Sequence, residues 1–414
     1  MRNSGDGMKI LMVNKFYYIH GGSETHYFTL KKLLERKGHT VIDFSMQDER
    51  NFESEYSGYF VKNVDYNGGG SVFEKIRIAK NVIYSSEAKK KFEQLVKDTK
   101  PDIVHLHIFQ HQISPSILYV IKKYNLPTVY TAHDLKLVCL NYQMLNHGKI
   151  CEDCKDGKLR HCLKNKCVKG SAAKSLINVA EGVVHRKRKS YDAIDEIITP
   201  SDFHRKKFIE FGESSDRLTH IANFVEDVPS DVDDREDKEQ YYLYYGRLSH
   251  EKGVPDLVKA VGKDIPLYIA GTGPKEEEIK EYITENKLDN VKMLGFKSGW
   301  ELYELVGNAK AVVIPSVVYE NSPYSGIESL CLRRPIIGAD IGGIPELIDG
   351  NGYLFESGNP DDLRAKLKAL DSLDEAEYNA MKKASFDIYR REHTPEVYYK
   401  KLTEVYDKAL KHSV

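Results

Sequence analysis

Short apolar runs alternate with helical patterns along the first half of the chain. The apolar runs have the length of strands, and the stretches between them carry apolar residues at helical spacing. They predict strands at residues 9–13, 40–44, 103–107, 128–132 and 196–199 and helices at 22–37 and 114–123. Continuous apolar strands separated by helices are typical of a parallel sheet covered on both faces. We therefore expect residues 8–224 to form one Rossmann-like domain.

The same alternation returns after an acidic segment at 226–239, which contains Pro229 and has the composition of an exposed linker. We place the linker at 225–239 and a second Rossmann-like domain at 240–394. Its predicted strands are 241–245, 267–270, 291–294, 311–314 and 336–338, and its predicted helices are 254–261, 275–286, 300–307, 325–331, 361–370 and 376–389. A last helix is predicted at 395–411, within a terminal segment 395–414. The sequence leaves open whether this helix crosses back to the first domain.

Composition and charge narrow the class of protein. The chain has 414 residues, of which 41% are hydrophobic and 30% charged, and its formal net charge is −1. That length favours two domains, and the charge disfavours a nucleic-acid partner. Residues 1–7 have no export-signal pattern, and no apolar run has the length of a membrane span, so a cytoplasmic protein is expected. The predicted fold class is α/β, with two doubly wound domains facing a central cleft and helices at the C-terminus.

The most informative segment is 314–328, where a strand ends, a polar loop with two prolines follows, and a helix begins near Ser325. Unpaired amides and the dipole at the start of such a helix favour a diphosphate, and Tyr324 and Ser325 supply those amides. Glu328 lies about one turn into the helix, within reach of a ribose diol. Glu320 lies in the loop, where it can meet a sugar hydroxyl. An arbitrary pair of glutamates is most often a surface pair, so the strand–loop–helix setting is what makes these two candidates.

Two cations follow the first strand of the second domain. Arg247 and Lys252 project from the loop that begins at Gly246. Together they can neutralise a diphosphate without a metal ion. Taken alone they would be an ordinary pair of surface cations. The functional interpretation is favoured because the loop 315–323, which carries Glu320 and is called the glutamate loop below, is expected to lie opposite them.

Glycine-rich turns follow two other strands. Gly21 and Gly22 follow the first strand of the chain and let the backbone approach an anionic group. Gly271 and Thr272 belong to a Gly-x-Gly turn, but Glu276 occupies the place of the third glycine of the dinucleotide fingerprint. A nicotinamide cofactor is therefore disfavoured.

Histidines gather near the ends of two strands. His105, His107 and His111 lie in or after one strand, and His133 with Asp134 ends the next. Alternation along a strand places His105 and His107 on one face, which favours core or cleft lining over metal ligation. His133 is placed to hydrogen-bond a sugar hydroxyl or a phosphate oxygen.

Taken together, these motifs resemble family 4 of the retaining glycosyltransferases, which have the GT-B fold, and in particular the subset that acts on bacterial polysaccharides. The resemblance covers most of the chain. It rests on segments 21–24, 132–134, 246–248, 270–274, 342–347 and 349–355, together with Lys252 and the Glu320/Glu328 pair. Two positions depart from the pattern, because Asn321 and Arg334 stand where many members have glycine.

The resemblance implies an acceptor-side domain at 8–224 and a nucleotide-sugar-binding domain at 240–394. It assigns roles to site residues: diphosphate binding to Arg247, Lys252 and the amides of Tyr324 and Ser325, ribose binding to Glu328, the donor sugar to Glu320, the base pocket to residues around Phe296, and the reacting sugar to His133. Further donor contacts are expected from Gly21, Gly22, Gly271 and Thr272. Family members retain the anomeric configuration and use no catalytic metal or other catalytic cofactor. The expected substrates are a nucleotide diphosphate-sugar and a glycan or lipid-linked acceptor in polysaccharide biosynthesis.

Four of the six cysteines crowd into an insertion at 139–170. Cys151, Cys154, Cys162 and Cys167 have a spacing similar to that of a zinc knuckle. A structural zinc and reduced or disulfide-paired thiols both remain open. Cys139 and Cys331 are expected to stand apart from this group.

A basic, partly amphipathic helix predicted at 172–191 raises the question of a membrane. Its apolar residues are followed by 185–189, which reads His-Arg-Lys-Arg-Lys. Such a stretch is typical of an ordinary packed helix with a solvated end, and peripheral contact with anionic lipid at the inner face of the plasma membrane is the competing hypothesis. For the whole chain, the competing functions are a nucleotide-sugar epimerase, a phosphorylase and a non-enzymatic bilobal binding protein.

Overall fold

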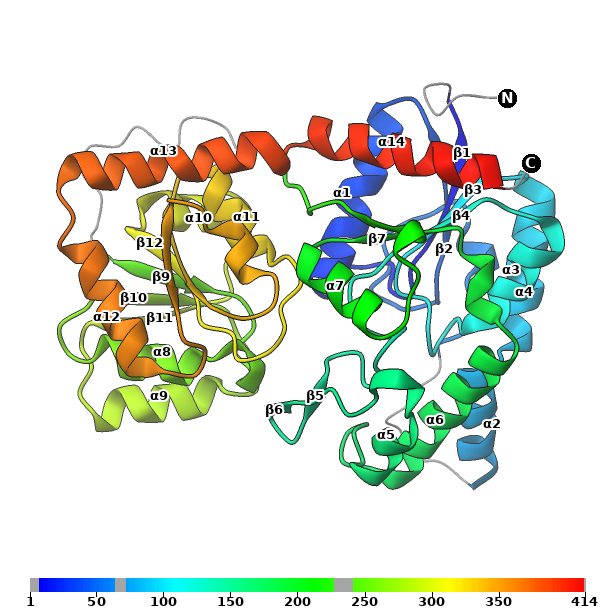
Figure 1. The fold of residues 1–414 in the computed structure, drawn as a ribbon, viewed down its shortest axis with the longest axis horizontal. Helices are drawn as coiled ribbons and strands as arrows, with labels where there is room; N and C mark the ends of the chain where they lie inside the picture. The colour runs from blue at the N-terminus through cyan, green and yellow to red at the C-terminus, as the bar shows by residue number, and fades with distance from the viewer. Residues whose placement is uncertain (1–6, 64–71, 227–240, 413–414) are drawn as a thin grey trace.

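A computed structural model describes residues 7–63, 72–226 and 241–412. These residues form two α/β lobes, and the last helices run along one side of both (Figure 1). Apart from Val225 and Glu226, the predicted linker lies outside the described residues. Among the described residues, no helix combines the length and apolar character needed to cross a bilayer.

The first lobe is built on a six-stranded parallel sheet in the order β2-β1-β3-β4-β7-β8. Its strands are β1 (Lys9–Val13), β2 (Thr40–Phe44), β3 (Ile103–Leu106), β4 (Thr128–Thr131), β7 (Glu196–Thr199) and β8 (Leu218–His220). Every residue of β3, β4 and β7 is buried, as expected for parallel strands covered on both faces. The covering helices are α1 (Gly22–Arg36), α2 (Val72–Ile83), α3 (Ser86–Thr99), α4 (Leu118–Tyr124), α6 (Ala172–Lys187) and α7 (Asp202–Glu210).

The second lobe repeats the design with the strand order β11-β10-β9-β12-β13-β14. Its strands are β9 (Tyr242–Tyr245), β10 (Leu267–Ala270), β11 (Val291–Gly295), β12 (Ala311–Ile314), β13 (Ile336–Ala339) and β14 (Gly352–Phe355). Its helices are α8 (Val254–Val261), α9 (Glu276–Glu285), α10 (Gly299–Asn308), α11 (Tyr324–Cys331), α12 (Pro360–Asp371) and α13 (Glu375–Glu392). The order reverses between β9 and β12, and ligands of such sheets bind beyond the strand ends at that point.

The last helix, α14 (Pro395–His412), belongs to the core of the first lobe although it follows the second lobe in sequence. Tyr398, Leu402 and Tyr406 are buried among residues of α1 and the first sheet. The hydroxyl of Tyr406 lies 2.7 Å from Nδ1 of His105 on β3. Helices α13 and α14 therefore tie the two lobes together along one side (Figure 1).

The cysteine-rich insertion projects from the first lobe between β4 and α6. It holds a two-residue hairpin, β5 (Leu145–Asn146) with β6 (Lys149–Ile150), and the short helix α5 (Arg160–Lys164). The hairpin points toward the second lobe (Figure 1). The observed architecture confirms the predicted fold class of two doubly wound α/β sheets with C-terminal helices.

Candidate active site

The loop between β12 and α11 carries the central ion pair of the site. Oε1 of Glu320 lies 2.6 Å from the ammonium nitrogen of Lys252 and accepts a 2.7 Å hydrogen bond from the hydroxyl of Ser316. Burial would raise the pKa of Glu320, but the charge of Lys252 and these two hydrogen bonds lower it below its ordinary value. Glu320 is thus a carboxylate held in place before any ligand arrives.

Glycine at position 253 permits this contact. Gly253 has a φ of +65°, and a β-carbon there would lie 1.9 Å from the carbonyl oxygen of Pro315. The two loops also share a backbone bond, from the amide of Val317 to the carbonyl of Glu251, at 3.0 Å. The loop 246–253, which carries Arg247 and Lys252, therefore packs against the glutamate loop. The donor-site hypothesis predicts that these two loops lie together. The side chain of Arg247 is exposed on the same loop.

The start of α11 offers the predicted anion-binding geometry. Pro323 occupies the N-cap position, and no side chain caps the helix. One turn in, burial raises the pKa of Glu328 to about 7, although a hydrogen bond from Tyr245 opposes this shift. The hydroxyl of Tyr245 also donates to the carbonyl of Ser325 at 2.8 Å, so β9 fixes the first turn of the helix. The first turn of α11 thus brings helix amides and a carboxyl with a raised pKa into the same part of the site.

Two further glycines allow neighbouring backbone segments to pack closely around the site. A β-carbon on Gly343 would lie 1.8 Å from the carbonyl of Asn321, and one on Gly271 would lie 1.9 Å from that of Gly246. The amide of Gly343 donates to the carbonyl of Glu320 at 2.8 Å. The segment 342–347 therefore supports the glutamate loop from behind.

On the first-lobe side, His133 belongs to a cluster of imidazoles. Nε2 of His133 lies 2.9 Å from Nδ1 of His107, and their rings stack. The rings of His105 and His107 also stack, with centroids 4.5 Å apart, which confirms that they share one face. Burial lowers the pKa of His133 to about 3, so its imidazole is neutral near pH 7 and can exchange hydrogen bonds without carrying charge.

The same cluster reaches the second lobe through His26. Its Nδ1 lies 3.1 Å from the hydroxyl of Tyr324, and its Nε2 lies 3.1 Å from that of Tyr398. The nearest ring nitrogens of His26, His107 and His133 all lie within 4.8 Å of one another. Because both nitrogens of His26 already have partners, we interpret the trio as a hydrogen-bonding network that lines the site.

Two side chains that bridge the lobes were not anticipated in this role. The amide of Asn321 donates to the carbonyl of Ala132 at 3.1 Å and accepts from the hydroxyl of Ser201 at 2.8 Å. Glu346 accepts from the amides of Asp202 and Phe203 at 2.9 and 2.7 Å, and so caps α7 of the opposite lobe. Asn321 is one of the two departures from the family pattern, and the structure turns it into an interlobe contact.

The other departure, Arg334, is buried rather than facing the site. Its Nε donates to the carbonyl of Leu332 at 2.9 Å.

Lys15 was not singled out from the sequence as a candidate residue. Burial lowers the pKa of Lys15, and the nearby carboxylates of Asp134 and Glu24 oppose that shift. A lysine directly after the first buried strand was a signal that the same strand-end reasoning could have used.

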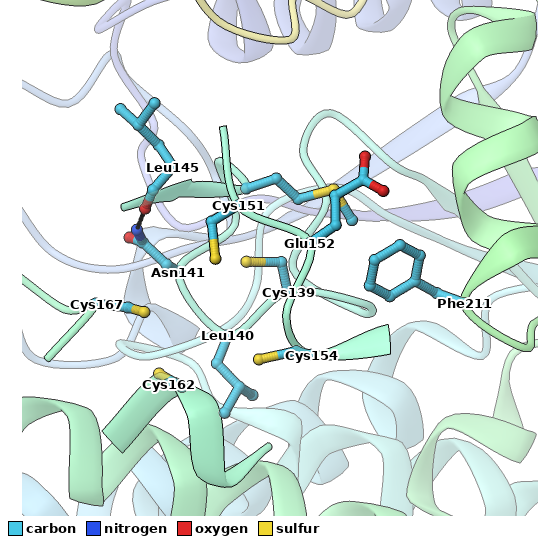
Figure 2. Close-up of a pocket in the computed structure, with 11 residues that line it drawn as sticks. Cys139, Leu140, Asn141, Leu145, Cys151, Glu152, Cys154, Cys162, Cys167 and Phe211 are labelled. Carbon is cyan, nitrogen blue, oxygen red and sulfur yellow. Dashed lines mark hydrogen bonds between the residues drawn. The ribbon is translucent and has the colours of Figure 1, made fainter. Parts of the chain in front are cut away.

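The remaining predicted residues stand around this centre. Gly22 lies beside the ring of Tyr324, since a β-carbon added at this glycine would be 3.5 Å from that ring. Thr272 is exposed beside Gly271, and Phe296, after β11, has 72% of its surface exposed. In the insertion, one expectation was wrong. Cys139 does not stand apart, since it lines one pocket with the four clustered cysteines (Figure 2).

Comparison with known proteins decides the family. Residues 20–227 match the model of Glycosyltransferase Family 4, and residues 230–386 match that of Glycosyl transferases group 1. The chain belongs to the family 4 glycosyltransferases. The predicted resemblance is thereby confirmed.

Relatives span the family broadly. An uncharacterized glycosyltransferase of Methanocaldococcus jannaschii is 24% identical over 88% of each chain. The O-antigen biosynthesis glycosyltransferase WbnH of Escherichia coli is 29% identical over 42% of this chain and 50% of its own length. Among solved structures, HepE of Anabaena, determined in complex with UDP and glucose, has a TM-score of 0.63 at 17% identity and covers 97% of this chain and 99% of its own. At that identity, the structural likeness bears on the fold alone.

Proposed function

We propose that this glycosyltransferase moves a sugar from a nucleoside diphosphate to a glycan or lipid-linked acceptor in cell-surface polysaccharide biosynthesis, with retention of the anomeric configuration. The observation that carries the proposal is the meeting of Lys252 with Glu320 at 2.6 Å, directly before the uncapped start of α11. Cations, helix amides and a sugar-facing carboxylate are the groups that departure of a diphosphate requires.

The donor would lie across the ends of the second-lobe strands. Arg247 and Lys252 would hold the diphosphate together with the amides of Tyr324 and Ser325, and Glu328 would accept hydrogen bonds from the ribose. The exposed ring of Phe296 is a surface on which a base could stack. The turn at Gly271 and Thr272 would pass close to the donor.

The reacting sugar would lie between Glu320 and His133, with Gly21 and Gly22 on its first-lobe side. Glu320 is already paired with Lys252, which suits a carboxylate that positions a sugar better than one that attacks it. We therefore propose front-face transfer through an oxocarbenium-like state. The charge that develops on the leaving diphosphate would be met by side-chain cations and amides, so no metal ion is required for the step.

Turnover of labelled nucleotide sugars, with and without acceptor fractions, tests this proposal. A thermal-shift screen selects the donor, and product NMR reports the anomeric configuration and separates transfer from epimerisation. We expect Lys252→Ala and Glu328→Ala to abolish turnover while the fold is kept, and addition of EDTA to leave it unchanged. The matched controls are Lys259→Ala and Glu277→Ala, which remove exposed charges of α8 and α9. Near-normal turnover in both site variants would contradict the assignment.

We also propose peripheral contact with the inner face of the plasma membrane through α6. Leu176 and Val183, seven residues apart on this helix, expose 54% and 37% of their surface. The residues 186–189, all Arg or Lys, are exposed at and just beyond its end. An apolar stripe that ends in cations complements an anionic lipid surface. The protein should co-sediment with vesicles rich in phosphatidylglycerol, and the double variant Leu176→Ser, Val183→Ser should stay in the supernatant. If the wild-type protein does not co-sediment at low salt, the proposed membrane contact is refuted.

A further inference from the structure

The cysteine-rich insertion encloses a second, separate site. Five thiols line one small pocket of the first lobe: Cys139, Cys151, Cys154, Cys162 and Cys167 (Figure 2). All five are free of disulfide bonds. The cavity among them has a volume of about 10 Å³, which is room for one atom-sized occupant and excludes an organic ligand.

Hydrogen-bond donors and positively charged residues surround the sulfurs. Backbone amides donate to three of them: those of Asn141 and Met144 to Cys139, that of Asp153 to Cys151, and that of Cys162 to Cys154. Amide donors stabilise the negative charge that a metal-bound thiolate carries. The insertion 139–170 also contains seven Lys or Arg residues against three Asp or Glu residues, and this excess offsets the net negative charge of a tetrathiolate zinc centre.

We propose that this pocket binds one zinc ion through Cys151, Cys154, Cys162 and Cys167. Among the described residues no three of these sulfurs lie within 4.8 Å of one another, so zinc binding requires their loops to move inward. The four proposed ligands lie on the insertion's own short loops and on α5. Cys139 instead packs against the core of the first lobe, where its amide bonds to the carbonyl of Leu135 at 2.7 Å. We therefore assign it as the fifth thiol, outside the proposed ligand set.

The zinc site would also act on the glutamate loop. Glu152 lies between two of the ligands and accepts a 2.9 Å hydrogen bond from the hydroxyl of Tyr319, the residue before Glu320. Lys207 of α7 holds the same carboxylate at 2.8 Å. A bound ion fixes the turn 151–154 and so keeps Glu152 against Tyr319. The metal is thus structural, and it supports the donor loop from the opposite lobe.

Metal analysis of the full chain tests the site without any activity assay. Protein purified anaerobically with a phosphine reductant should contain stoichiometric zinc. Replacement with cobalt should give thiolate-to-cobalt charge-transfer absorption and the visible bands of a tetrahedral site. Cys162→Ser should lose both signals, whereas the matched control Cys139→Ser should keep them. Absence of metal with five reactive thiols, or peptides linked by disulfides in the same preparation, would overturn the site.

Hydrogen exchange separates the ion from its action on the donor loop. Removal of zinc by a chelator should speed exchange in 317–323 as well as in 150–168, and Glu152→Gln should speed exchange in 317–323 while zinc is retained. If only 150–168 responds to the chelator, the coupling is refuted and the metal site stands. This outcome does not depend on whether the enzyme transfers sugar, so it is distinguishable from failure of the proposed function.

Discussion

Replacing Glu320 with glutamine should separate binding of the leaving group from transfer of the sugar. In the structure the ammonium group of Lys252 is already engaged by Glu320 at 2.6 Å, with 32% of the lysine and 13% of the glutamate side chain exposed. Exposed pairs contribute up to about 1 kcal/mol, and loss of one partner of a buried pair costs about 3–5 kcal/mol. For this half-buried pair we take about 1–2 kcal/mol. In Glu320→Gln the lysine is free for the diphosphate, so binding of a nucleoside diphosphate should strengthen by about 5–30-fold.

Turnover should move the other way. If Glu320 orients the transferred sugar, its amide replacement should lower kcat by about 100-fold, the scale of loss for a misplaced reactant. Calorimetric titration of the preferred nucleoside diphosphate into the wild-type protein, Glu320→Gln and Lys252→Ala measures the first effect, and product formation from labelled donor measures the second. Glu277→Gln is the control. Nucleoside diphosphate affinity that is equal in all three proteins would show that Lys252 is not a diphosphate ligand.

Three further predictions concern single residues. Burial raises the pKa of Glu328 to about 7; if the ionised form accepts bonds from the ribose as proposed, nucleotide affinity should rise as pH increases through about 7 and become flat in Glu328→Gln, as calorimetry can check. The raised pKa also means that this group's contribution to folding stability is present at low pH and is lost as pH rises through about 7, which urea unfolding would detect. Phe296→Ala should weaken nucleotide binding by about tenfold in the same titration if the base stacks there, with little change in melting temperature. Asn321→Ala removes two interlobe hydrogen bonds of about 1 kcal/mol each, so scattering should report a larger radius of gyration, and an unchanged radius would count against an interlobe role.

The sequence was sufficient for the fold because parallel strands leave an unambiguous pattern. Strands such as 9–13, 267–270 and 311–314 are apolar at every buried position, and each was placed at its observed bounds. The helices α3 and α7 were missed: α3 carries seven charged residues among fourteen, and α7 exposes much of its length. The strands β8 and β14 were also missed, because each is short and only partly buried.

The candidate site was predictable to the extent that its residues follow strand ends. Lys252 and Glu320 lie 68 residues apart, and they meet because β9 and β12 are neighbours in the sheet. Contacts between the lobes could not be predicted from the sequence, because no local pattern indicates which loop of one lobe packs against which loop of the other. Asn321 was noticed only as a departure from glycine, and its partner Ser201 gave no signal at all. The fifth thiol of the cysteine pocket was missed for the same reason, because Cys139 is separated from Cys151 by the hairpin.

Several interlobe contacts converge on one short stretch of chain. Tyr319 bonds to Glu152, Asn321 to Ser201 and Ala132, and Tyr324 to His26. All three belong to the loop that holds Glu320 or to the first residue of the helix behind it. Any separation of the lobes must therefore break bonds on both sides of Glu320, and any closure re-forms them. If the same loop holds the donor as proposed, its interlobe bonds would couple closure over the substrate to the assembly of the site.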